Sequence, residues 1–392
     1  MAFSLVFYNA ILLLSTLFVW LSEKASTPMQ RKVCTLIAFL IVFLPAALRY
    51  EIGIDYFSYK IIFENIRDGL DPFWQSKMEP GYYFLNWIVA SIGLPYEALV
   101  ALCSFIIFLF FFKSYPLKNK YLIHFILISL LYFTANNLIR NWMALSIAWY
   151  GVARFATDKS LIKYLVLILI SALFHKSSLL LVVLALPFVN FKVLKEYKKL
   201  LNIFLLCLAI ILFLYGQDVF RALLSGSVAN ALGYASYATS WYAQDTELGT
   251  GFGVVFYTVF LLVSLLALKD ESSHYFKVVY ISIAIAVVIQ IAAAQIHIFG
   301  RLKYVFFYAF FLAFLILLKN RFLPFRTLAY MLLLISLYNF NNSILQGSTD
   351  YMETCRGGRI TPYVSVFNKE DSNRDPYLTS RYNWCDAYFE NK

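Results

Sequence analysis

The chain is poor in charged residues. Asp, Glu, Lys and Arg make up 14% of its 392 residues, about half the share that a soluble domain carries. It contains no G-x-x-x-x-G-K-[ST] motif, no G-x-G-x-x-G and no D-x-D pair for a metal–nucleotide sugar complex. The G-x-S-x-G turn of a nucleophilic serine is missing too. These absences leave no means of using ATP or a cytoplasmic nucleotide sugar, and we expect no cofactor.

The cysteines form no metal-binding pattern. Three of the five, Cys34, Cys103 and Cys207, fall in apolar runs and are most simply packing residues. Cys355 and Cys385 lie in the polar C-terminal tail, and no C-x-x-C or Cys/His spacing is present. We therefore expect no metal. In an oxidising compartment the two tail cysteines are candidates for a disulfide.

Apolar sequence is abundant instead. The chain is 61% hydrophobic with a mean hydropathy of +0.70, and apolar runs of roughly 15–20 residues alternate with short polar segments, as in transmembrane helices. We predict an all-α polytopic integral membrane protein with about twelve transmembrane helices (roughly 10–14) and a cavity at its outer face. The predicted spans are residues 3–21, 33–48, 82–112, 121–136, 138–156, 161–174, 177–190, 199–215, 253–269, 278–296, 303–318 and 326–341. The third is kinked or in two pieces at Gly93-Leu94-Pro95, and the pair 161–174 and 177–190 is short enough to be re-entrant.

Basic residues predict the orientation of these spans. One set of loops holds 18 Lys and Arg and the opposite loops hold nine, so the first set faces the cytoplasm. The same loops explain the net charge of +11, and we expect no nucleic-acid partner. Residues 1–341 then form a transmembrane domain. Both termini, the outer loops 49–81 and 216–252, and a polar tail over residues 342–392 face the other side, which is the periplasm in a bacterium.

Residues 49–81 form a polar stretch with six carboxylates and four cations. A segment this charged lies at the membrane surface or lines a wet cavity. Four cations stand at outer ends of separate predicted spans: Arg49, Arg140, Lys176 and Arg301. Because the planar guanidinium group of arginine forms paired hydrogen bonds with phosphate, we interpret these cations as a binding site for one shared anion, such as a lipid pyrophosphate. The alternative is that each reaches the headgroups or pairs with Glu51, Asp55 or Glu79.

Three residues are candidates for acid–base chemistry. Asp55 is either a carboxylate facing the cavity or the N-cap of a short interfacial helix. Glu79, before Pro80-Gly81, is either a salt-bridge partner or a general base. His175, at a predicted outer hairpin tip, can move a proton near neutral pH, although a histidine in an F-H-K-S-S turn can equally be a structural hydrogen bonder.

Aromatic residues offer a surface for sugar. Tyr234, Tyr237 and Trp241 are spaced i, i+3, i+7 in the loop 216–252, which places them on one helical face. They either anchor the protein or stack on sugar rings, and we add Tyr59 of the polar stretch to the candidate sugar-binding residues.

Several short motifs together resemble a known family. They are R-Y-E-I-G-I-D-Y-F-S-Y (49–59), E-P-G-Y (79–82), R-N-W-M-A (140–144), F-H-K-S-S-L-L (174–180) and Arg301-x-x-Tyr304. The pattern is similar to the EpsG-like polysaccharide polymerases, which are grouped with the Wzy-type O-antigen and capsule polymerases. The likeness covers roughly residues 40–310, and the tail from Asn342 has no counterpart. The matching motif residues are Arg49, Gly53, Asp55, Tyr59, Glu79, Gly81, Arg140, His175, Lys176, Ser178 and Arg301.

The resemblance implies a function at the outer face of the bacterial inner membrane. A glycan chain carried on undecaprenyl pyrophosphate is transferred to the next lipid-linked repeat unit, in the synthesis of lipopolysaccharide O-antigen, capsule or exopolysaccharide. We expect a metal-independent glycosyltransferase, with Asp55, His175 or Glu79 as the base and the four cations on the pyrophosphate. Its partners are the lipid-linked oligosaccharide and membrane lipids, with a chain-length regulator protein left open. A lipid-linked oligosaccharide flippase, an O-antigen ligase and a sugar acyltransferase are the alternatives.

Overall fold

The fold is all-helical over the part of the chain that the structure describes. This computed structural model describes residues 2–74, 76, 78–116, 118–188, 197–225, 251–269, 273–295, 297–347 and 360–371. Every named element in these ranges is a helix, and the one β-bridge joins Arg49 to Ser365. The prediction of an all-α protein is therefore confirmed. The chain divides into two compact units.

Unit 1 comprises residues 1–153, 169–176 and 333–392. Its helices are α1 (Ala2–Lys24), α2 (Pro28–Ala47), α3 (Tyr56–Arg67), α4 (Pro80–Ser91), α5 (Tyr96–Lys113) and α6 (Lys120–Asn137). It also contains most of α7 (Ile139–Asp158), the end of α8 (Leu161–Ala172) and the second half of α17 (Leu323–Leu345).

Unit 2 comprises residues 154–168 and 177–332. Its elements are most of the 3₁₀-helix η1 (Lys176–Phe188), α10 (Lys198–Ser225), α13 (Phe252–Ala267), α14 (His274–Ala293), α15 (His297–Leu302) and α16 (Tyr308–Lys319). Helix α14 contacts α10, α13, α15 and α16 and so forms the centre of this unit.

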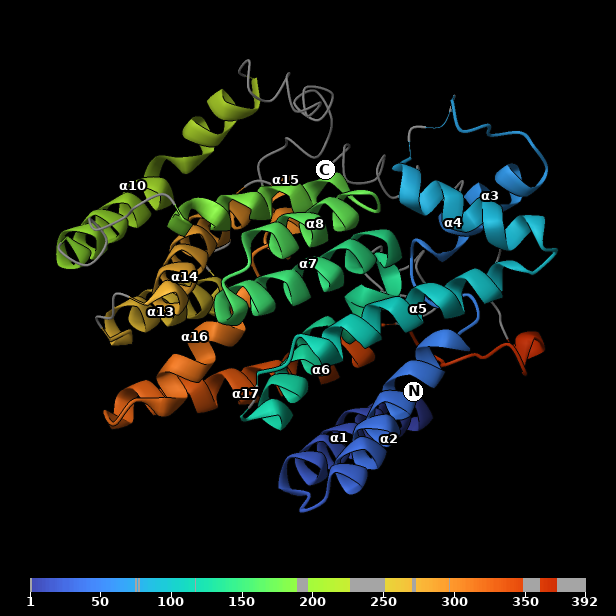
Figure 1. Cartoon of the computed structure of the whole chain (residues 1–392), viewed down its shortest axis with the longest axis horizontal. Coiled ribbons are helices and arrows are strands. Elements are labelled where there is room, and N and C mark those ends of the chain that lie inside the picture. Colours follow the sequence, from blue (N-terminus) through green and yellow to red (C-terminus); the bar gives the residue numbers. More distant parts are fainter. Residues whose placement is uncertain are drawn as a thin grey trace. The chain divides into compact units, whose positions relative to one another are not determined.

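Helices α1 and α2 form an antiparallel hairpin (Figure 1). The hairpin closes where Thr27 caps α2: the Thr27 side chain accepts a hydrogen bond from the Gln30 backbone at 3.2 Å, and the Gln30 side chain accepts one from the Thr27 backbone at 3.3 Å. Pro28 opens the helix, where its missing N–H costs nothing. Lys24 and Glu23 thus lie at one end of unit 1, and the end of α2 lies at the other.

Six helices of the described residues are long and apolar enough to cross a membrane, and four further apolar helices are shorter. The predicted count of about twelve spans stays a prediction. The predicted third span is two helices, because Gly93, with a φ of +74°, and Pro95 separate α4 from α5. Helix α4 has only 12 residues and packs with α3 at the start of α5 (Figure 1). The pair over 161–174 and 177–190 is also short, as α8 and η1.

Residues 360–371, here called the C-terminal strap, pack against unit 1. The Tyr50 backbone N–H donates to the Val364 carbonyl at 2.9 Å, and the Lys369 ammonium lies 2.8 Å from a Glu97 oxygen of α5. The strap thus holds the residues that follow α2. The predicted start of the tail at residue 342 falls inside α17, and Cys355 and Cys385 lie outside the described residues.

Candidate active site

The site is built around the first turn of α4. Pro80 occupies the first position of this helix, and Gly81 donates its backbone N–H to the Leu173 carbonyl at 2.8 Å. A Cβ on Gly81 would come within 2.8 Å of the Leu173 backbone oxygen and side chain. Only glycine therefore allows α4 to approach the end of α8 so closely. This contact carries Glu79 to the chain segment that follows α8.

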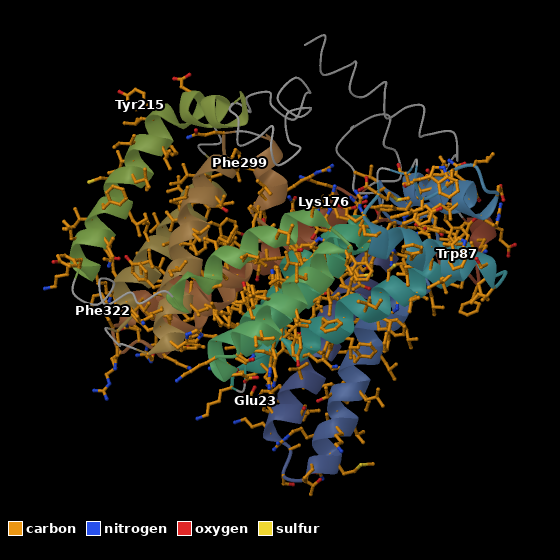
Figure 2. All side chains as sticks on the ribbon, turned by 45° about the horizontal axis from the view of Figure 1, so that its top comes forward. Glu23, Trp87, Lys176, Tyr215, Phe299 and Phe322 are labelled. Atoms are coloured by element: carbon orange, nitrogen blue, oxygen red, sulfur yellow. The ribbon has the colours of Figure 1, made fainter. Side chains whose placement is uncertain are left out.

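Glu79 joins three partners from two other segments. Its Oε2 lies 3.0 Å from Nη1 of Arg140, at the start of α7. Its Oε1 accepts from His175 Nδ1 at 3.1 Å and from the Lys176 backbone N–H at 3.3 Å. We call Glu79, Arg140, His175 and Lys176 the Glu79 cluster. Figure 2 shows Lys176 and Glu23 toward opposite ends of unit 1, so the cluster lies away from the α1–α2 turn.

The electrostatics of the cluster fix its charge. Glu79 is 8% exposed, whereas Arg140 and His175 are 27% and 29% exposed. Burial raises the pKa of Glu79, but the His175 hydrogen bond and the Arg140 charge outweigh it and lower the pKa to about 2. Glu79 is therefore ionised at neutral pH, and His175 donates through Nδ1, because an ionised carboxylate can only accept.

Arg49 is buried in unit 1 and is not exposed at the site. Its side chain is buried, with 1% exposure. Nη1 donates to the Ser104 hydroxyl of α5 at 2.9 Å and to the Ala46 carbonyl, and Nη2 donates to the Asn136 carbonyl at 3.0 Å. These bonds join the ends of α2 and α6 to α5. The described packing therefore gives Arg49 a structural position, and its predicted contact with an anion stays a prediction.

Asp55 stands at the N-cap position of α3, as one of its two predicted alternatives required, but its side chain makes no capping hydrogen bond. Its backbone N–H donates to the Asn137 side chain at 2.9 Å. Gly53 has a φ of +102°, and a Cβ there would lie 3.1 Å from the same Asn137 oxygen. The loop between α2 and α3 thus packs on the junction of α6 and α7, three residues before Arg140.

Tyr59 lies on α3 beside the first turns of α4. Its ring meets the ring of Tyr82 edge to face, with centroids 5.8 Å apart. Tyr82 is buried and follows Glu79 by three residues in the first turn of α4. Tyr59 is half-buried and so lies near the cluster through its contact with Tyr82.

The remaining predicted residues lie elsewhere. Arg301 is exposed on α15 of unit 2, where its carbonyl accepts from the Tyr304 backbone N–H at 3.3 Å. Ser178 is buried in η1 of the same unit. Tyr234, Tyr237 and Trp241 are outside the described residues. Within the described ranges no three His, Cys, Asp or Glu residues gather as metal ligands.

Sequence reasoning missed the residues that position the cluster. The Asn137 side chain holds the Asp55 backbone, and its signal was an amide at the end of an apolar run, three residues before Arg140. Arg49 is held by the backbone carbonyl of Asn136, for which the sequence gives no signal, because every residue has a carbonyl. Ser104 gave no signal, because a serine within an apolar run commonly bonds to its own helix, as this one also does with the Val100 carbonyl.

Comparison with known proteins identifies the family. Residues 32–363 match the model of the EpsG family. The chain belongs to the EpsG family. The match extends beyond the expected residues 40–310 and includes α17 and the start of the C-terminal strap, which corrects the expectation that the chain beyond Asn342 has no counterpart. No curated protein and no solved structure matches the chain. Family membership and the apolar helices together make it a multi-pass membrane protein with a general role in glycosyl transfer of the polysaccharide-polymerase type.

Proposed function

We propose that this EpsG family protein is a polymerase that transfers a glycan chain from undecaprenyl pyrophosphate to the next lipid-linked repeat unit. The observation that carries the proposal is the Glu79 cluster, in which one buried carboxylate orients a histidine and an arginine side by side. Glycosyl transfer from a pyrophosphate needs a base for the acceptor and positive charge for the leaving group. The cluster contains both.

In the proposed reaction the acceptor hydroxyl attacks the anomeric carbon of the donor sugar. The bond between that carbon and the pyrophosphate oxygen breaks, and its electron pair leaves with the pyrophosphate. His175 takes the acceptor proton on Nε2, because its Nδ1 already carries the proton donated to Glu79. Glu79 is a poor base itself, since its pKa of about 2 keeps it ionised with little proton affinity. Asp55 is the second candidate for the base.

We propose that Arg140 and the Lys176 ammonium bind the pyrophosphate. Arg140 is partly exposed, and Lys176 is exposed, so both can reach a ligand. Arg49 acts here as a positioning residue, through Asn136 and the start of α7. We also assign Arg301 to the pyrophosphate and the aromatic residues Tyr59, Tyr234, Tyr237 and Trp241 to the sugars. On the charge distribution of the loops, the site faces the periplasm of a bacterial inner membrane, and a chain-length regulator is a candidate partner.

The test replaces single residues in the host strain and separates the surface polysaccharide by chain length on a gel. We expect Arg140→Ala and His175→Ala to remove long chains, since loss of a general base alone typically slows a reaction roughly 10²–10⁴-fold. Arg301→Ala tests the assignment in unit 2 in the same way. The control is Arg67→Ala, which removes an exposed α3 arginine whose ion pair, in the part of the chain that the structure describes, is with its neighbour Asp68, and it should leave chain length unchanged.

Protein levels must be equal by immunoblot for the comparison to count. Wild-type chain length in Arg140→Ala or His175→Ala would refute the assignment. Accumulation of single repeat units at the surface is the expected phenotype of a polymerase defect. If repeat units instead stay linked to the inner-membrane carrier as long chains, the protein acts as a ligase, and if they stay on the cytoplasmic face it acts as a flippase.

A further inference from the structure

Unit 2 contains a cavity that the proposed function does not use. Its volume is about 280 Å³, and it lies where the end of α13, the start of α14 and the end of α16 meet. Figure 2 shows Phe322, two residues beyond the cavity residue Asn320, at the end of unit 2 away from Phe299 of α15. The cavity is therefore at the opposite end of this unit from Arg301.

The polar side chains that line the cavity are hydrogen-bond donors. Lys269 follows α13 and Lys319 ends α16, and both are exposed. Tyr275 contributes a phenol from the first turn of α14. The Asn320 side-chain oxygen accepts from the Phe322 backbone N–H at 2.9 Å, which leaves its amide nitrogen to donate to a ligand. Among the described residues that line the cavity there is no carboxylate.

A third lysine stands behind the cavity wall. Lys198, at the start of α10, is buried, and its ammonium donates to the carbonyl of Leu268. The same ammonium lies 5.8 Å from the ring centroid of Phe276. Because Leu268 and Phe276 both line the cavity, three lysines from separate segments lie in or next to its wall.

The rest of the wall is apolar. Leu315 and Ile316 of α16 line it, and Leu266, next to the cavity on the short apolar helix α13, is 65% exposed. Pockets that enclose a drug-sized molecule have volumes of about 300–1,000 Å³. This cavity lies just below that range, so its size suits a headgroup whose chains continue along the exposed apolar side chains of α13, such as Val259 and Leu266.

We propose that this cavity binds the phosphate of an anionic phospholipid, with Lys269 and Lys319 on the phosphate and Tyr275 and Asn320 as hydrogen-bond donors. Basic pockets between transmembrane helices on the cytoplasmic side are a recurrent type of anionic-lipid site. The loops at this end are among the lysine-rich ones that the charge distribution assigns to the cytoplasm. The bound lipid therefore belongs to the inner leaflet. The inference is independent of the polymerase reaction.

The experiment uses the full-length protein in detergent, with native mass spectrometry to measure retention of phosphatidylglycerol against phosphatidylcholine. The test variant is Lys269→Gln with Lys319→Gln. The matched control is Lys24→Gln with Lys32→Gln, which removes the same charge from exposed positions around the α1–α2 turn. We expect the test variant to bind phosphatidylglycerol roughly 10- to 30-fold more weakly, and the control to bind as the wild type does.

Tyr275→Phe gives a second test that removes only a hydroxyl and should weaken retention severalfold. Wild-type retention in the test variant overturns the proposal, and so does an equal loss in the control, because net charge alone would then explain binding. Inorganic phosphate is added in a separate arm. If it gives a lysine-dependent thermal shift while the protein does not prefer phosphatidylglycerol, the site binds a free anion and the lipid assignment is wrong.

Discussion

Replacing Glu79 by Gln tests whether the cluster is held together by charge. The amide keeps the size of the side chain and an acceptor for His175, but it removes the negative charge that faces Arg140. The pKa of Glu79 falls from an ordinary 4.5 to about 2, and such a fall corresponds to about 3 kcal/mol of native-state stabilisation at neutral pH. The variant should lose about that amount of unfolding free energy, which corresponds to roughly 6–12 °C in thermal midpoint for a domain of 150–250 residues.

The pH dependence gives the sharper signature. A carboxylate with a lowered pKa stabilises the folded state above its unfolded pKa, and this contribution is lost as the pH falls toward the folded pKa. The difference between the wild type and Glu79→Gln should therefore be largest near pH 7 and shrink as the pH falls from about 4.5 toward 2. Thermal unfolding of the detergent-solubilised protein across this pH range measures it.

Asp68→Asn is the control for this experiment. Asp68 is half exposed, and within the described ranges its ion pair is with its neighbour Arg67, so its loss should leave stability nearly unchanged. If Glu79→Gln is as stable as the wild type at pH 7, or if its deficit is the same at every pH, the charge of Glu79 does not hold the cluster. The polymerase proposal would then lose its orienting residue.

Three further predictions follow from the packing around the cluster. Gly81→Ala should lower the free energy of unfolding by about 1–3 kcal/mol and reduce activity, because the added Cβ would lie 2.8 Å from Leu173. The control Gly253→Ala, whose Cβ would have no neighbouring atom within 4 Å, should be neutral, and equal thermal midpoints for the two variants would contradict this prediction. Arg49→Lys keeps the positive charge but removes the planar guanidinium group, and should lower the free energy of unfolding by roughly 3 kcal/mol. Loss of activity without loss of stability would instead indicate that Arg49 contacts the ligand directly. A protein truncated after Asp371 should still produce polysaccharide of wild-type length on the gel, whereas truncation after Gly347 removes the C-terminal strap and should shorten the polysaccharide. The same phenotype from both truncations would show that the strap does not support the site.

The sequence predicted the helical class and part of the site from local signals. Gly93 and Pro95 predicted the break between α4 and α5, and a short helix that begins after Asp55 was one of the two alternatives for that residue. The pairing of an outer cation with Glu79 was one of two stated alternatives, and Arg140 adopts it. Each of these features depends on a residue and its near neighbours, or on a choice between few partners.

The burial of Arg49 and the docking of the strap were not predictable in this way. An arginine at the end of an apolar run looks the same in sequence whether it faces solvent or turns inward to Ser104, 55 residues away. The strap meets α1 through a bond from the Tyr8 hydroxyl to the Ile360 carbonyl, 352 residues apart. A pattern in the sequence has no means of selecting such a partner, since the contact depends on how the whole unit packs.

The charges of the Glu79 cluster explain how one carboxylate would serve both steps of the proposed reaction, which are proton removal from the acceptor and departure of the pyrophosphate. Arg140 and Glu79 form an ion pair whose charges cancel, and Lys176 contacts Glu79 through its backbone N–H. Proton uptake by His175 adds one positive charge at the moment when the pyrophosphate gains negative charge. Because Glu79 touches both Arg140 and His175, the new charge forms next to the arginine that is proposed to bind the leaving group, where it can stabilise that group. Proton transfer and departure of the carrier would then assist each other, which two separately held groups would do less well.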